Sequence, residues 1–229
     1  MHDDILVVIP ARAGSKGIPH KNSKELGGKP LISYSIDIAR HITSDEHICV
    51  STDDPRILEI ANEMRLPVPF VRPTELAGDD ATTNDVLLHA LNHYLLTGTD
   101  YKKILLLQPT SPFRTVVQVE EAIELFTHDI DMVVSVKKSH SASVICHEDT
   151  SGYLSLSLNS GARRRQDLPQ FYEYNGAIYV INSTSLRNKG MSNFNKKVKY
   201  VMDEVSSLDI DSALDWNVAE YLIEHHHVF

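Results

Sequence analysis

The sequence of 229 residues predicts an α/β fold in which a mainly parallel sheet carries helices on both faces. One observation is the run 5–9, which is apolar at every position and therefore fits a strand buried on both sides. Another is the alternation of strand-like and helix-like stretches, which is the pattern of a doubly wound sheet. At this length a single domain, residues 1–229, with a small appendage is the most economical organisation.

The first half of the chain has the clearest elements. Residues 27–30 form a turn whose Pro30 suits the first turn of a helix. Asp53 or Asp54 is expected to cap the second helix, and Thr83 or Asn84 the third. The expected strands are 5–9, 47–52, 68–71 and 103–108, and the expected helices are 31–40, 55–64, 85–96 and 117–126.

The second half returns to the sheet after an excursion. Strands are expected at 131–136, 176–181 and 198–202, followed by a closing helix at 212–224. Residues 137–170 have short apolar stretches among polar residues, which indicates an excursion from the core and not a further layer of the sheet. It carries Arg163, Arg164 and Arg165. In an acidic protein such a triplet forms a solvated turn or binds an acidic substrate, and its spacing favours neither.

A basic loop directly follows the first buried strand. It carries Arg12, Lys16 and Lys21, with Gly14 and Gly17 between them. Loops at the carboxyl ends of parallel strands bind ligands in open α/β sheets. Glycine lets backbone N–H groups approach an anion closely, and the cations neutralise its charge. The loop therefore favours a nucleoside triphosphate site over an ordinary basic surface loop.

Further polar residues follow other strands at the same edge of the sheet. Arg72 comes after the third expected strand and begins a polar loop, residues 72–83, whose length is typical of a functional or disordered segment. Gln108 ends the strand 103–108, and the hydroxyls of Thr110 and Ser111 follow it. We therefore expect these side chains to share the ligand edge with the basic loop.

Asp209 and Asp211 occupy alternate positions of an extended segment. Alternate side chains of extended backbone point to the same face. Mg²⁺ usually takes one or two carboxylates and fills its shell with water and phosphate oxygens, so the pair predicts a magnesium site. The alternative is that Asp211 or Ser212 merely caps the last helix. Capping would account for one residue and would assign no role to Asp209.

The composition excludes several classes of protein. The formal net charge of -9 argues against general nucleic-acid binding, which needs a basic surface. No apolar run approaches the ~20 residues that cross a bilayer, so no membrane segment is expected. Cys49 and Cys146 each sit alone in an apolar segment, which predicts two buried free thiols and a cytoplasmic location.

Five short motifs follow one another along the chain. They are IPARAGSKG at 9–17, KN at 21–22, LQPTSPFR at 107–114, YNGAIY at 174–179 and LDID at 208–211. In this order they resemble the bacterial CMP-sialic acid synthetases, the acylneuraminate cytidylyltransferases, which include relatives that activate legionaminic acid. The resemblance covers residues 5 to about 221. It implies a Rossmann-like fold and a homodimer in which residues 137–200, which contain the excursion and the sugar pocket, supply much of the contact.

The resemblance also implies roles for individual residues. The nucleotide-binding residues would be Ala11, Arg12, Ser15, Lys16, Lys21, Asn22, Arg72 and Thr83. The family often has serine in place of Thr83. The sugar-binding residues would be Gln108, Arg165, Asn175 and Tyr179, with Arg165 facing the sugar carboxylate. The resemblance assigns no role to Arg163 or Arg164. Asp209 and Asp211 would hold Mg²⁺.

The implied reaction transfers CMP from CTP to the 2-hydroxyl of a nine-carbon α-keto acid sugar and releases pyrophosphate. The hydroxyl would attack the α-phosphorus in line with the leaving group, so the protein would act mainly by positioning and charge neutralisation. Arg12, Lys16 and Lys21 would offset charge on the pyrophosphate. Metal bound at Asp209 and Asp211 would lower the pKa of the attacking hydroxyl.

Other interpretations concern the identity of the acceptor sugar and the class of protein. The acceptor could be N-acetylneuraminate, N,N'-diacetyllegionaminate, pseudaminate or 3-deoxy-manno-octulosonate, and residues 202–207 look more like those of the legionaminic relatives. A P-loop kinase is excluded because the chain has no G-x-x-x-x-G-K-[ST] motif. A non-catalytic nucleotide-sugar binding module should have lost a metal carboxylate or a loop cation, and all are present.

Overall fold

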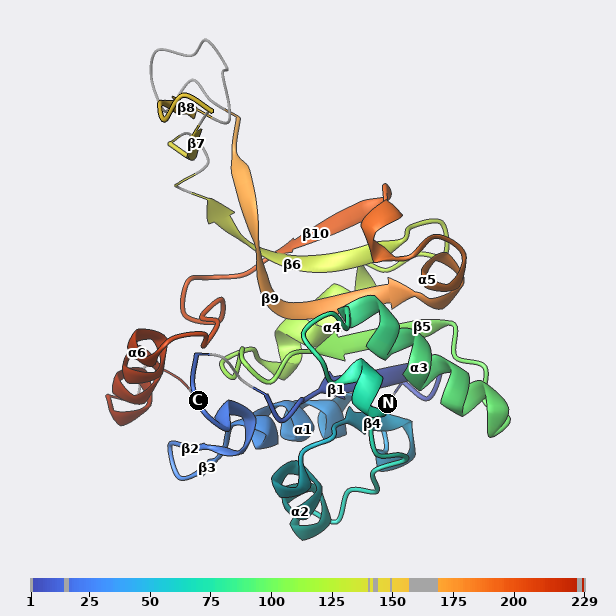
Figure 1. Ribbon diagram of the computed structural model, residues 1–229. Helices are drawn as coiled ribbons and strands as arrows, with labels where there is room; N and C mark the ends of the chain where they lie inside the picture. Colours follow the sequence, from blue (N-terminus) through green and yellow to red (C-terminus); the bar gives the residue numbers. More distant parts are fainter. Residues whose placement is uncertain are drawn as a thin grey trace.

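The centre of the molecule is a six-stranded sheet with the strand order β10-β6-β9-β5-β1-β4 (Figure 1). The computed structural model describes residues 2–14, 17–139, 141, 144–148, 150–156, 169–225 and 228. The strands are β1 Ile5–Pro10, β4 Ile48–Ser51, β5 Lys103–Leu107, β6 Met132–Ser139, β9 Phe171–Asn182 and β10 Lys197–Val201. β1 pairs in parallel with β4 and β5, and β10 with β6, whereas β9 runs antiparallel to β5 and β6. The predicted mainly parallel sheet is confirmed, with β9 as its reversed strand.

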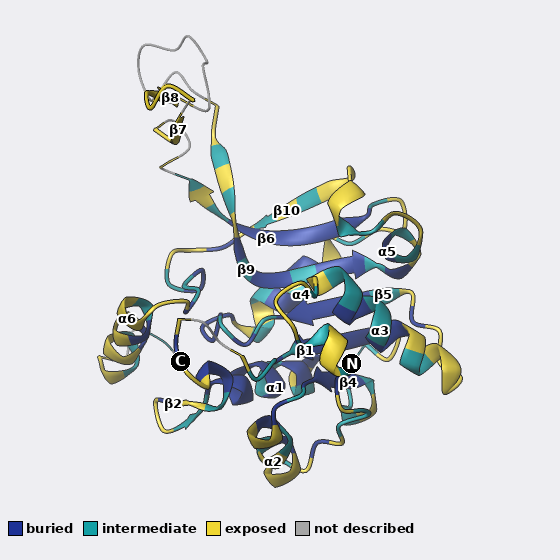
Figure 2. Cartoon of the chain, viewed as in Figure 1, coloured by how far each residue is buried: buried dark blue, intermediate teal, exposed yellow. Residues whose placement is uncertain are grey.

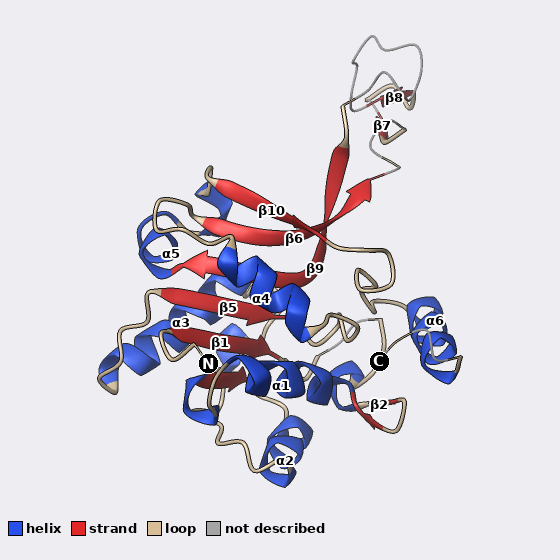
Figure 3. Ribbon diagram, turned by 180° about the vertical axis from the view of Figure 1, so that it is seen from behind, coloured by secondary structure: helices blue, strands red, loops and turns tan. Residues whose placement is uncertain are grey.

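Helices cover both faces of this sheet, as predicted. Alternate residues of β1 belong to two different core clusters, because successive side chains of a strand point to opposite faces. One cluster includes residues of α1 (Leu31–Ile42), α2 (Pro55–Glu63) and α4 (Val116–Glu124). Figure 3 shows α1 and α4 in front of the sheet. The other cluster includes residues of α3 (Thr83–Leu96) and α5 (Ser183–Lys189).

The last helix, α6 (Ala213–Glu224), lies beside the short hairpin formed by β2 (Glu25–Leu26) and β3 (Lys29–Pro30), away from the main sheet (Figure 1). Trp216 and Ala219 of α6 are buried against Leu26 and Leu31 in a third, smaller cluster. None of the helices in the described part of the chain combines the length and apolar character that crossing a bilayer requires.

The helix caps refine the predicted boundaries. Asp54 caps α2, accepting a hydrogen bond from the backbone N–H of Arg56 at 3.0 Å. Thr82 caps α3 in a reciprocal capping box with Asp85, so the prediction of Thr83 or Asn84 was wrong by one or two residues. Ser212 caps α6, and the Asp211 side chain is therefore not used as the cap.

The structure has no strand at 68–71, so that prediction was wrong. Only one isolated bridge, between Thr52 and Val71, joins this segment to the end of β4. Pro67 and Pro69 have no backbone N–H to donate, so a continuous ladder cannot form here. β5 takes the place beside β1 instead.

The predicted excursion leaves the sheet as a two-stranded ribbon. Residues 137–139 of β6 pair with 171–173 of β9, and the ribbon leads to a small hairpin of β7 (Cys146–Glu148) and β8 (Leu154–Leu156) (Figure 1). Figure 2 shows that this hairpin is exposed. Cys146 is consequently exposed, contrary to prediction, whereas Cys49 is buried and burial raises the pKa of its thiol to about 12. Residues 163–165 lie outside the described residues.

Asp131 anchors the amino end of β6. Its carboxylate is 2 % exposed and accepts hydrogen bonds from the Ser185 hydroxyl at 2.6 Å and the Lys189 ammonium at 2.8 Å. It also accepts two backbone N–H bonds, from Asn195 and Lys196. The bonds from Lys189 and Ser185 are the largest causes of a lowered Asp131 pKa. The carboxylate thus ties together β6, α5 and the approach to β10.

We predict that Asp131→Asn lowers the free energy of unfolding at pH 7 by about 2 kcal/mol, since charge-assisted hydrogen bonds are lost. Because the folded-state pKa is lowered, the stabilisation by ionised Asp131 is present above the ordinary Asp pKa of about 4 and lost as pH falls through the folded value. The difference between wild type and variant should therefore narrow below about pH 4. Urea denaturation across pH measures it, with Asp3→Asn as the exposed control. A pH-independent difference would contradict the assignment.

Candidate active site

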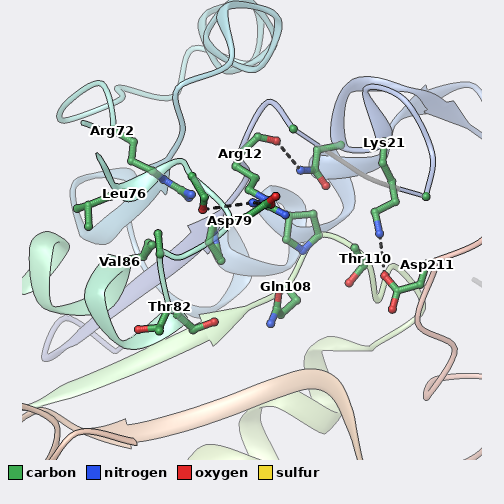
Figure 4. A pocket seen from close by; sticks show the side chains of 18 of the residues that line it. Arg12, Lys21, Arg72, Leu76, Asp79, Thr82, Val86, Gln108, Thr110 and Asp211 are labelled. Carbon is green, nitrogen blue, oxygen red and sulfur yellow. Dashed lines mark hydrogen bonds and ion pairs between the residues drawn. The ribbon is translucent and has the colours of Figure 1, made fainter. Parts of the chain in front are cut away.

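A cavity of about 610 Å³ opens at the carboxyl ends of β1 and β5 (Figure 4). This is the edge where the sequence placed a ligand site. Four segments contribute the described residues that line it, namely 10–22, 72–86, 108–110 and 209–211. The predicted residues Arg12, Lys21, Asn22, Arg72, Thr83, Gln108, Asp209 and Asp211 are all among them.

The basic loop contacts the carboxylate segment directly. Lys21 is 9 % exposed, and its ammonium donates to the Ile210 carbonyl at 2.6 Å and to Asp211 Oδ1 at 2.9 Å. A Cβ atom added at Gly17 would lie 2.1 Å from the Asp211 carbonyl oxygen. Only glycine permits such an approach without displacement, so Gly17 has a packing role besides leaving the loop backbone accessible.

Asp209 lies deeper in the cavity than Asp211. The backbone N–H of the intervening Ile210 donates to the Thr110 carbonyl at 2.8 Å, which ties the carboxylates to the end of β5. Burial raises the pKa of Asp209, and the negative charge of Asp211 adds to the rise, while hydrogen bonding from Thr110 opposes it. Asp209 Oδ1 is buried and has no hydrogen-bond partner among the described residues.

These two carboxylates fit a hard cation. The unpartnered Asp209 oxygen is open to a donor or a cation, because a buried acceptor left unsatisfied is destabilising. Among the described residues no group of three or more histidine, cysteine, aspartate or glutamate side chains could hold a metal. A cation at Asp209 and Asp211 would thus take its remaining ligands from water or phosphate, as Mg²⁺ does.

Arg72 lies on the far side of the cavity from Lys21 and Asp211, and Arg12 lies between them (Figure 4). Arg72 is 5 % exposed, and its guanidinium donates to the hydroxyl and carbonyl oxygens of Ser51 at the end of β4. Burial lowers the Arg72 pKa, and the charge of Asp53 opposes that effect. Arg12 donates from Nη1 to Asp79 Oδ1 at 2.9 Å and to the Gly78 carbonyl at 3.3 Å. The loop 72–83 is therefore a wall of the cavity.

A buried arginine beneath the cavity was not assigned a role from the sequence. Arg114 is 2 % exposed and donates to the carbonyls of Gln108 and Ala177 and to the Ser35 hydroxyl. Burial lowers its pKa to about 9, and the charge of Asp209 acts against this. Arg114 thus joins the end of β5 to the middle of β9 and to α1. Its place in the motif at 107–114 was the only signal in the sequence.

Three predicted residues do not line the cavity. Ala11 is fully buried, and its N–H donates to the Ser51 carbonyl at 2.9 Å. Asn175 is 3 % exposed; Ser135 and the Ala177 N–H donate to its oxygen, and its amide donates to Ser207 at 2.9 Å and to the sulfur of Met202.

Tyr179 is the third of these residues. It lies on β9 outside the cavity wall, with its ring edge-on to Tyr174 at 6.5 Å. Burial raises the pKa of Tyr179 to about 12, and the charge of Asp209 contributes. Ser15, Lys16 and Arg165 lie outside the described residues.

Comparison with known sequences decides the family. The sequence model of the family described as "Cytidylyltransferase" matches residues 6–225. The chain belongs to this cytidylyltransferase family. Within it, the chain is 35% identical over 223 residues to the N-acylneuraminate cytidylyltransferase of Escherichia coli O18:K1:H7, covering 96% of this chain and 52% of the relative. It is 34% identical to the CMP-N,N'-diacetyllegionaminic acid synthase of Legionella pneumophila, covering 96% of each. The chain thus spans about half the length of the first relative and nearly all of the second.

Solved structures share the fold of this cytidylyltransferase-family chain. CMP:2-keto-3-deoxy-manno-octonic acid synthetase, solved in complex with CTP, superposes with a TM-score of 0.70 at 17% identity and covers 97% of this chain and 99% of its own. The 4-diphosphocytidyl-2C-methyl-D-erythritol synthase of Anaerococcus prevotii has a TM-score of 0.65 at 14% identity and covers 96% of both chains. At these identities the likeness supports the predicted Rossmann-like fold.

We predict that Gly17→Ala separates the basic loop from the 209–212 segment, because the new Cβ meets a backbone oxygen that cannot rotate away. Amides of residues 209–215 should then exchange with solvent about tenfold faster, as measured by hydrogen–deuterium exchange. Gly14→Ala is the matched control, since a Cβ there has no atom within 4 Å. Equal exchange in the two variants would show that the contact does not hold the segment.

Proposed function

We propose that this chain transfers CMP from CTP to the 2-hydroxyl of a nine-carbon α-keto acid sugar and releases pyrophosphate. The observation that carries the proposal is the contact of the basic loop with a carboxylate pair inside one cavity, through Lys21, Gly17 and Asp211. A site for phosphate charge and a site for a hard cation are therefore adjacent. The names of the relatives from Escherichia coli and Legionella pneumophila support this reaction.

The residues of the chain would act by positioning and by neutralising charge. Arg12 and Lys21 lie where they can contact the phosphates, and Lys16 would join them from the same loop. Asn22, Arg72 and Thr83 line the cavity from the sides and would hold the cytosine and ribose. Gln108, at the end of β5, would contact the sugar, and the Arg114 bond to its carbonyl fixes the backbone there.

Mg²⁺ is the proposed cofactor, and Asp209 and Asp211 would hold it. When bound, the ion would supply positive charge beside the phosphates and lower the pKa of the attacking hydroxyl. Lys21 would still hold this segment when the ion is bound, because its ammonium also donates to the carbonyl of Ile210, the residue between Asp209 and Asp211.

The acceptor belongs to the sialic or legionaminic type in this proposal. Relatives with these two names are 35% and 34% identical, whereas a pseudaminic acid cytidylyltransferase of Campylobacter jejuni is 28% identical. The octulosonate enzyme is similar in fold at 17% identity. A non-catalytic binding module is disfavoured because Arg12, Lys21, Asp209 and Asp211 all line the cavity.

We also propose a cytoplasmic homodimer. CTP is made inside the cell, so an enzyme that consumes it works there. The β7–β8 hairpin and the residues just before it carry exposed apolar side chains, among them Val144 at 67%, Ile145 at 50% and Leu154 at 75% exposure. Covering such side chains with a second copy would bury apolar area that a monomer leaves in water.

The reaction is tested by pyrophosphate release from CTP and Mg²⁺ with a panel of sugars. We expect release with N-acetylneuraminate or N,N'-diacetyllegionaminate, and none without a sugar. UTP in place of CTP is the control for the base. Binding of CTP without release of its pyrophosphate in the presence of any sugar of the panel would contradict the proposal and favour a binding module.

We predict that Asp211→Ala lowers kcat by about a hundredfold or more at saturating Mg²⁺, because a metal ligand and the partner of Lys21 are both lost. Steady-state kinetics with varied Mg²⁺ measures the effect. Glu220→Ala removes an exposed carboxylate of α6 that does not line the cavity and is the control. Near-normal turnover of Asp211→Ala would remove this residue from the metal site.

We predict that Arg165→Ala raises the KM for the sugar at least tenfold and leaves the KM for CTP nearly unchanged, because a charged hydrogen bond to the sugar carboxylate is lost. Kinetics with each substrate varied in turn measures both constants. Arg163→Ala and Arg164→Ala provide the comparison within the triplet. A weakened CTP affinity with an unchanged sugar KM would show that the assignment is wrong.

A further inference from the structure

The charges around the cavity cancel among the described residues. Its lining includes the cations Arg12, Lys21 and Arg72 and the carboxylates Asp79, Asp209 and Asp211. A carboxylate in a site for a triphosphate repels the ligand, so each carboxylate of the lining needs a role. The proposed function gives Asp209 and Asp211 to a metal ion. Asp79 is then the one described carboxylate of the lining without a role in the reaction.

Asp79 is paired with a cation that the reaction needs. Arg12 Nη1 lies 2.9 Å from Asp79 Oδ1 and 3.3 Å from the Gly78 carbonyl, so a single donor group holds two consecutive residues of the loop. The same carbonyl accepts the Ala81 N–H at 3.3 Å, which shapes the turn that presents Asp79. Figure 4 shows the pair inside the cavity, between Arg72 on one side and Lys21 with Asp211 on the other.

The side chains of Arg12 and Asp79 are also exposed enough to solvent for their ion pair to separate. The side chains of Arg12 and Asp79 are 35% and 58% exposed, respectively. Ion pairs of this exposure are weak, because water and salt screen them. A phosphate oxygen offers the same kind of acceptor as a carboxylate and brings more charge. A triphosphate that reaches Arg12 therefore replaces Asp79, and the two anions repel each other at close range.

We propose that Asp79 competes with the phosphate chain for Arg12, so that it weakens the binding of both CTP and pyrophosphate. The inference rests on the proposed function, since it takes CTP as the ligand and pyrophosphate as the product. In the free enzyme the Asp79 carboxylate holds the loop 72–83 against Arg12. The incoming phosphates displace it, and after the transfer its return to Arg12 helps the pyrophosphate to leave.

Calorimetric titrations of the full chain test this competition. The ligands are CTP, inorganic pyrophosphate and cytidine, and the proteins are wild type, Asp79→Asn and Asp80→Asn. Asp80→Asn removes the same charge from the same loop, and Asp80 is exposed and not part of the cavity lining. We expect Asp79→Asn to bind CTP and pyrophosphate about threefold to tenfold more tightly than wild type. Cytidine has no phosphate, so its affinity should not change.

A second comparison locates the effect at Arg12. In an Arg12→Gln background, Asp79→Asn should no longer tighten the binding of pyrophosphate, because the contested donor is gone. An equal gain in that background would overturn the competition for Arg12. Equal affinities of Asp79→Asn and Asp80→Asn for CTP would also overturn it, and would reduce the effect to general loop charge.

The outcome also separates this inference from the proposed function. If wild type binds CTP and releases pyrophosphate while Asp79→Asn matches wild type in every titration, only the competition is wrong. If wild type binds neither CTP nor pyrophosphate, the proposed function and the competition both fail. Melting temperatures of all variants should agree with that of wild type, because Asp79 and Asp80 lie on an exposed loop.

Discussion

The site depends on the contact between the first loop of the chain and a segment close to its end. Lys21 and Asp211 are 190 residues apart in sequence, and their ion pair closes the cavity on one side. Gly17 lies against the same segment so closely that no side chain would fit. The contact requires two rigid supports. β1, buried on both faces, fixes where the loop starts, and α6 with its Ser212 cap fixes where the segment ends. The cations of the basic loop and the carboxylates of the 209–211 segment become neighbours for this reason.

Buried polar groups under the cavity hold the strand ends in register. Arg114 connects the carbonyls of Gln108 and Ala177, and Asn175 connects Ser135 with Ser207. A buried polar group left without its partner destabilises the fold, so these networks fix one arrangement of β5 and β9. Gly176, between Asn175 and Ala177, has φ +76, and a Cβ there would lie 3.3 Å from Asp209 Oδ2. The carboxylate therefore rests on a turn in the strand that only glycine adopts easily.

The cations of the cavity have protein partners that a ligand would replace or share. Lys21 holds Asp211, Arg12 holds Asp79 and Arg72 holds Ser51. These pairs differ in burial, and burial decides how easily they exchange. Arg72 and Lys21 are nearly enclosed, so they are fixed parts of the wall. The Arg12 pair is open to solvent, so it can respond to an incoming anion.

The sequence by itself determined the layered α/β fold, the ligand edge and the candidate site residues at that edge. These features follow from local patterns, such as the apolar run of β1 and the glycines and cations after it, which need no knowledge of distant contacts. Pattern alone failed at 68–71, where prolines remove the donors that a strand needs, and at Cys146, whose strand has no core to pack against. The inward turn of Asn175, the clamp formed by Arg114 and the pairing of Arg12 with Asp79 came only from the tertiary structure. Each of these contacts depends on which distant segment packs against the side chain, and the local sequence pattern does not specify that segment.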